Sequence, residues 1–126
     1  MVTHVNTGSA FEAEIGYSRA VCCDGWAFVS GTTGYDYTSM MMPDAVQDQC
    51  ANALKTISDA LTEIGATLDD VVRVRYILPE KSDFSVCWPK LREAFGVAKP
   101  AATMISAELM NPEMKIEIEV TARIPA

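Results

Sequence analysis

Apolar residues recur at helical spacing between positions 44 and 64. Every third or fourth residue of this stretch is apolar, which is the period of a helix that buries one face. Asp44 and Gln47 follow Pro43 in a capping-box-like arrangement, and Gly65 suits the position just after a helix. The pattern predicts a helix that begins at Asp44 and ends before Gly65.

A second, shorter helix is predicted after Ser82 and Asp83. Its single apolar stripe consists of Phe84, Trp88, Leu91 and Phe95. Pro89 lies inside this stretch, and because proline lacks an amide N–H we expect it to kink the helix or to split off a first turn. Gly96 is expected to end the helix.

Strands are predicted between and around the two helices. Residues 71–78 are dense in β-branched side chains and are followed by Pro79. Further strands are expected at residues 26–31, 102–109 and 115–121, with a weaker one at 19–23. Each helix then connects two strands as a crossover. This order predicts an α+β fold in which two helices pack on one face of a mixed sheet and leave the other face uncovered.

Charged side chains alternate with apolar ones on the uncovered face. Glu117 and Glu119 alternate with isoleucine and valine, and Arg73 and Arg75 alternate with valine and tyrosine. One interpretation is a solvated face with cross-strand charge pairs, each contributing about 0.2–1 kcal/mol. The other is that these faces meet between subunits and enclose a polar cavity. The alternation alone is compatible with both.

Length and composition exclude several classes of protein. The 126 residues fit a single domain, and no apolar run is long enough to span a membrane. The first residues lack the pattern of a secretion signal, so we expect a cytoplasmic protein. Seventeen acidic against ten basic residues give a net charge of −7, which disfavours nucleic acid as a partner. The four cysteines and the one histidine show no metal-ligand spacing, so no metal site is expected.

The chain resembles the RidA (YjgF-like) family from about residue 15 to residue 124. No single motif carries the resemblance, which rests on the order and spacing of several short runs: Gly16-Tyr17-Ser18-Arg19-Ala20-Val21, Phe28-Val29-Ser30-Gly31, Gly65-Ala66, Asp69-Asp70-Val71-Val72, Asp83-Phe84, Phe95-Gly96, Pro100-Ala101 and Lys115-Ile116-Glu117-Ile118-Glu119. The resemblance implies a chorismate-mutase-like fold in which the last strand inserts beside the first. It also implies a homotrimer with three equivalent small-molecule pockets at the subunit boundaries.

In active deaminases of this family, a small imino acid is hydrolysed to a 2-keto acid and ammonia without a metal or an organic cofactor. The resemblance implies that an arginine after the Pro-Ala pair holds the substrate carboxylate, that a glutamate on the last strand handles the attacking water, and that a tyrosine near the N-terminus lines the site. The matching residues here are Ala102, Glu117 and Tyr17. A methyl group cannot pair with a carboxylate, so we expect imines of ordinary amino acids to be hydrolysed poorly or not at all.

The remaining candidate binding residues surround this substitution. Met104 shares the strand face of Ala102 and makes that end of the expected pocket more apolar. Ser30 lies in one of the matching runs. Arg73 and Arg75, together with Arg19, are the candidate replacements for the missing cation, although each could instead hold the trimer together.

Three functions follow as hypotheses. The first is hydrolysis of an imine, an enamine or a related C–N compound other than the usual amino-acid imines, with Glu117 directing water. The second is a non-catalytic trimer that binds a metabolite. The third, a ribonuclease, is disfavoured by the acidic charge and by the absence of a histidine pair.

Overall fold

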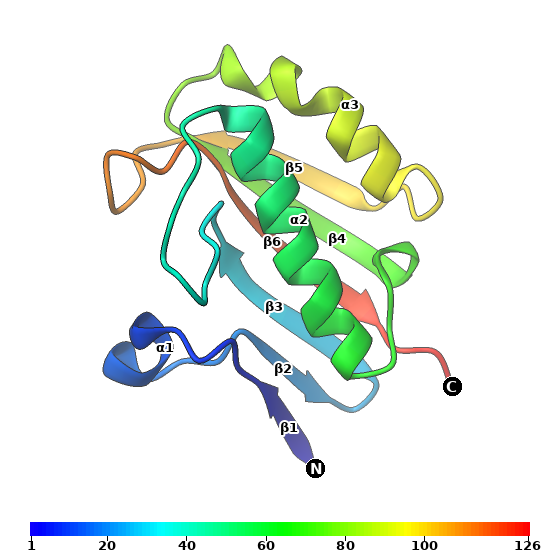
Figure 1. Cartoon of the computed structure of the whole chain (residues 1–126). Coiled ribbons are helices and arrows are strands. Elements are labelled where there is room, and N and C mark those ends of the chain that lie inside the picture. The colour runs from blue at the N-terminus through cyan, green and yellow to red at the C-terminus, as the bar shows by residue number, and fades with distance from the viewer.

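The computed structural model describes residues 1–126 and contains one six-stranded sheet with helices on one face (Figure 1). The strands occur in the order β1-β2-β3-β6-β4-β5 across the sheet. The elements are β1 (Val2–Val5), α1 (Ala10–Ile15), β2 (Ala20–Cys23), β3 (Trp26–Thr32), α2 (Val46–Glu63), a 3₁₀ turn (Leu68–Asp70), β4 (Val71–Leu78), α3 (Asp83–Phe95), β5 (Ala101–Ser106) and β6 (Glu117–Arg123). The predicted α+β class with two main helices on a mixed sheet is confirmed.

The last strand, β6, lies in the middle of the sheet. It pairs antiparallel with both β3 and β4, while β4 and β5 are parallel. β5 and β6 therefore do not form a hairpin, because β4 lies between them. The expectation that the last strand lies beside the first predicted strand is wrong, because β3 separates β6 from β2, which corresponds to that strand.

The two main helices bury the apolar face of the sheet. Helix α2 packs on β3 and β6, and α3 packs on α2 and β4 (Figure 1). The core is a continuous cluster that includes Ile57 and Leu61 from α2 and Ile116 and Ile118 near the start of β6, all fully buried. Since a buried aliphatic side chain is worth about 1.5–3 kcal/mol, this cluster supplies most of the driving force for folding.

The helix boundaries differ in detail from the predictions. Helix α2 begins at Val46 rather than at Asp44, and its N-cap, Ala45, provides no capping side chain. Its end agrees with the prediction, because Gly65 adopts the left-handed conformation, with φ 83°, that glycine accommodates without steric cost. Helix α3 is continuous from Asp83 to Phe95 with Pro89 inside, so the predicted split does not occur.

Two N-terminal elements were not predicted. Strand β1 adds a fourth antiparallel pairing, to β2, and α1 is a short helix whose N-cap Ser9 accepts a hydrogen bond from the Glu12 amide. Strand β5 is also shorter than predicted and ends at Ser106. None of the helices combines the length and apolar character that crossing a membrane requires.

The register of the sheet places the charged residues as the alternation predicted. Arg75 pairs with Glu119 across β4 and β6, and Ile77 pairs with Glu117 on the same face. This face carries no helix (Figure 1). The Nη1 atom of Arg75 lies 2.9 Å from Oε1 of Glu119, so one of the predicted cross-strand ion pairs is present.

Candidate functional site

Glu117 starts β6 on the open face of the sheet, and its carboxyl group packs against the backbone of Gly31. A Cβ atom at position 31 would lie 2.8 Å from Glu117 Cδ, so only glycine leaves room for this carboxyl group. Glu117 is half-buried and forms no ion pair within 4.0 Å. Burial raises the pKa of Glu117, the charge of Glu119 raises it further, and Arg19 opposes both. The raised pKa makes this carboxyl group better suited than an ordinary glutamate to transfer protons near neutral pH.

Arg19 is fully buried beside this group and organises the surrounding backbone. Its Nη1 atom donates to the Gly31 carbonyl at 2.9 Å and to Thr32 Oγ1 at 3.0 Å. Its Nη2 atom lies 3.5 Å from Glu12 Oε2, and the guanidinium stacks on the Tyr37 ring at 4.6 Å. Because it is fully buried and its donors are largely engaged within the chain, Arg19 is in no position to replace a substrate-binding cation.

Tyr17 and Ser30 are brought to the same end of the sheet as Glu117. The Tyr17 hydroxyl accepts a hydrogen bond of 3.2 Å from Arg19 Nη2, which connects it through Arg19 to Gly31. The Ser30 hydroxyl donates to the Ser18 carbonyl at 2.7 Å, so its proton is committed to the backbone while its oxygen can still accept. Tyr17, Ser30 and Glu117 thus form one half of a candidate site.

Arg73 and Arg75 lie farther along the open face. Together with Phe28, Glu119 and Thr121 they line a shallow depression of about 220 Å³. Arg75 is already paired with Glu119, and both side chains are almost half exposed. A pair of that exposure contributes about 0.2–1 kcal/mol, so it is a modest structural feature.

Ala102 and Met104 lie on the opposite face of the sheet from Glu117. Ala102 pairs with Val74 and Met104 pairs with Tyr76, two residues of the buried core, so their side chains point to the helix side. There they line a groove of about 410 Å³ between α3 and β5. A single chain therefore does not bring Ala102 and Met104 together with Glu117.

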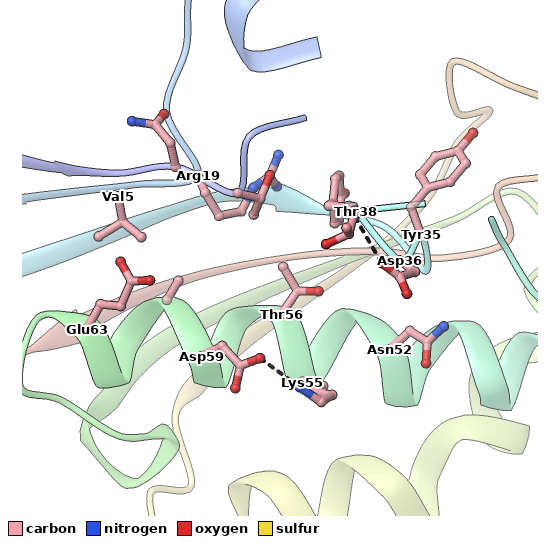
Figure 2. Close-up of a pocket in the computed structure, with 14 residues that line it drawn as sticks. Val5, Arg19, Tyr35, Asp36, Thr38, Asn52, Lys55, Thr56, Asp59 and Glu63 are labelled. Atoms are coloured by element: carbon pink, nitrogen blue, oxygen red, sulfur yellow. Dashed lines mark hydrogen bonds and ion pairs between the residues drawn. The ribbon is translucent and has the colours of Figure 1, made fainter. Parts of the chain in front are cut away.

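A polar cleft of about 500 Å³ lies elsewhere, between α2 and the β1 edge of the sheet (Figure 2). Of the candidate residues named from the sequence, only Arg19 lines this cleft. Asn52, Lys55 and Asp59 line it from α2. Lys55 and Asp59 pair with each other at 2.8 Å, and no half-buried carboxylate comparable to Glu117 lies there. We therefore place the candidate chemistry at Glu117. No group of three or more histidine, cysteine, aspartate or glutamate side chains could hold a metal ion.

Comparison with known proteins identifies the family. The model of the family described as endoribonuclease L-PSP matches residues 7–124. The chain belongs to the endoribonuclease L-PSP family. The crystal structure of Rv2704 from Mycobacterium tuberculosis, described as a member of the YjgF/YER057c/UK114 family, superposes with a TM-score of 0.89 at 36% identity and covers 98% of this chain and 100% of that one. The resemblance to the RidA (YjgF-like) family is thereby confirmed.

Two further proteins are similar to this chain over most of their length. A RutC family protein of Pyrococcus abyssi is 30% identical over 107 residues, which are 84% of each chain. A rat protein named 2-iminobutanoate/2-iminopropanoate deaminase is 29% identical over 119 residues, which are 94% of this chain and 87% of the rat protein.

Several residues around the candidate site were not predicted from the sequence. Gly31 stood out only as part of a matching run, yet it determines where the Glu117 carboxyl group lies. Trp88, Arg92 and Lys99 line the groove beside Ala102. Strand alternation could not reveal them, because they come from α3 and from the loop that follows it.

Proposed function

We propose that this L-PSP family chain is a small-molecule hydrolase that acts on an imine, an enamine or a related C–N compound. The observation that carries the proposal is the half-buried Glu117 carboxylate, which has a raised pKa, no ion-pair partner, and Gly31 in close contact with it. The acidic net charge of −7 tells against RNA as the substrate, despite the family's name.

Glu117 would act on water as a general base. It removes a proton while the water oxygen bonds to the imine carbon, and the imine nitrogen takes up a proton. The carbinolamine formed in this way loses ammonia as its C–N bond breaks, which leaves a carbonyl product. A single acid-base group of this kind is worth about 10²–10⁴ in rate.

The pocket would lie between two copies of the chain. Glu117 lies on the open face of the sheet, with Tyr17 and Ser30 at the same end, while Ala102 and Met104 face a groove on the helix side. A pocket that uses both sets therefore needs a second chain. Exposed apolar residues support such a boundary, because all six residues of β5 are exposed and its outer edge is unpaired.

The first prediction is that the protein is a homotrimer in solution. Burial of the β5 edge and of the open sheet face between copies removes apolar surface and unpaired backbone groups from water. Light scattering coupled to size exclusion should give three times the chain mass of 13.7 kDa. A monomer at micromolar concentration would contradict the shared pocket.

The second prediction is that Ala102→Arg raises the hydrolysis of 2-iminopropanoate, generated in the assay from alanine by an amino-acid oxidase. Wild type should hydrolyse this imine poorly, because no cation stands at position 102. A new bidentate contact with the carboxylate should raise kcat/KM about tenfold or more. Ala101→Arg is the matched control, since Ala101 pairs with Arg73 and points to the opposite sheet face.

The outcome of this assay also tests whether the chain is an enzyme at all. Rapid wild-type turnover would show that position 102 is not needed for the carboxylate. If neither wild type nor Ala102→Arg hydrolyses any imine of a broad panel, while some of these compounds still raise the melting temperature, the chain is a non-catalytic metabolite-binding protein instead.

A further inference from the structure

The groove between α3 and β5 is apolar along most of its length. Eight of its twelve lining residues are hydrophobic, and they come from the inner side of α3 and from β4 and β5. Ala102 lies in this lining, where its small side chain leaves the groove open. The volume of about 410 Å³ is in the range of pockets that hold small organic molecules.

Aromatic side chains form one wall of the groove. The rings of Tyr76 and Phe84 lie 5.3 Å apart, and those of Phe84 and Trp88 meet edge to face at 6.2 Å. Trp88 is 51% exposed and Met104, across the groove, is 54% exposed. Large apolar side chains left this exposed at a concave surface favour an apolar occupant, because covering them releases ordered water.

The charges of the groove are of one sign. Arg92 and Lys99 are its only charged lining residues, although the chain as a whole has a net charge of −7. Neither of them forms an ion pair. Arg92 lies in the last turn of α3, where the helix dipole favours a cation whether or not a ligand binds. Lys99 lies beyond the helix, so the helix dipole does not account for a basic residue there. Two free cations in an acidic protein favour an anionic ligand group.

We propose that this groove binds a small carboxylate with an aromatic body, the body lying on Trp88 and Met104 and the carboxylate at Arg92 and Lys99. This inference rests on the proposed function and names the substrate class of the same site. The carboxylate then lies at the Lys99 end, where β5 begins, rather than at position 102. The aromatic body uses the space that Ala102 leaves open.

Tryptophan fluorescence provides a direct test, because the chain contains only two tryptophans and Trp26 lies on β3, outside the groove. In Trp26→Phe, Trp88 is the only reporter. The probe is 3-phenylpropanoate, and the two comparison compounds are propanoate, which lacks the ring, and 3-phenylpropanamide, which lacks the charge. We expect a saturable fluorescence change with 3-phenylpropanoate and at least tenfold weaker binding of the other two.

Charge-neutral variants test the role of the cations. Arg92→Gln combined with Lys99→Gln should bring the affinities of the acid and the amide within about twofold of each other. Lys90→Gln is the control on the same helix, because Lys90 faces a different surface depression. It should leave the preference for the acid unchanged. A thermal-shift titration of the unmodified protein with the three compounds repeats the test without the Trp26 substitution.

The binding assay is independent of catalysis and is repeated in Glu117→Gln. Equal binding of the acid and the amide would overturn the assignment of the carboxylate site. The inference would also be overturned if no aromatic compound bound and Trp88 fluorescence changed only when the protein was diluted. That result would show that a second copy of the chain fills the groove. If the acid binds selectively but no imine is ever hydrolysed, the proposed function fails while the groove assignment stands.

Discussion

Glu117→Gln is expected to lower imine turnover by about 10²–10⁴-fold without lowering the stability of the fold. Glutamine keeps the size of the side chain and its packing against Gly31 but cannot accept a proton from water. Burial raises the pKa of Glu117, so the ionised carboxylate is disfavoured in the folded protein. A neutral amide at this position removes that penalty.

The sign of the stability effect follows from the direction of the pKa shift. A carboxyl group whose pKa is raised by folding contributes its stability at low pH and loses it as the pH rises through the folded-state pKa. Glu117→Gln should therefore melt at the same temperature as wild type or higher at pH 8, and any gain should shrink on acidification. Turnover by wild type should fall as the pH drops through a pKa above that of an ordinary glutamate, whereas residual activity of the variant should lack this transition.

Glu119→Gln is the matched control, because it makes the same chemical change two residues along β6 on the same face. It removes the exposed pair with Arg75 and the charge that helps to raise the pKa of Glu117. A loss of about 0.2–1 kcal/mol, nearly full activity at neutral pH and a pH transition at lower pH are therefore expected. Melting temperature and turnover are measured on the same preparations. A Glu117→Gln protein that loses about 3–5 kcal/mol of stability yet keeps its activity per folded molecule would show that Glu117 is half of a buried ion pair.

Arg19→Met is expected to reduce the free energy of unfolding by about 3–5 kcal/mol, which is the usual cost of removing one partner of a buried ion pair. Arg19 is fully buried, and Glu12 beneath it is only 5% exposed. Without the guanidinium, the Glu12 carboxylate keeps only its hydrogen bonds to Thr7. The Gly31 carbonyl also loses its donor from Arg19. The loss is measured by urea denaturation at one fixed protein concentration.

Arg123→Met makes the same change at an exposed site, where the guanidinium donates to the Asp24 carbonyl and packs over the Trp26 ring. It should cost no more than about 1 kcal/mol. The double variant Arg19→Met with Glu12→Gln should recover part of the loss, because the unpaired carboxylate is gone. A cost below about 1 kcal/mol for Arg19→Met alone would show that water reaches Glu12 and that the pair is not a buried one.

The sequence by itself determined the main helices, five of the six strands approximately, and the segregation of polar residues to one sheet face. Helical and strand periods are local, so residues 44–64 and 115–121 reveal their type without any partner. The short elements β1 and α1 could not be predicted from periodicity, because four to six residues give too little pattern. Ser9 followed by Glu12 is a capping signal that could have indicated α1.

The tertiary structure alone decided which strand faces lie on the same side of the sheet. Alternation shows that Ala102 and Met104 share a face and that Glu117 and Glu119 share one. It cannot show that the two faces are opposite, because this depends on the register of β4 against both β5 and β6. The burial of Arg19 is equally invisible in the sequence, since arginine is ordinarily exposed and only the closure of α1 and the Tyr37 ring around it excludes water. The groove beside Ala102 exists only because α3 packs across β4 and brings Trp88, Arg92 and Lys99 to the edge of β5.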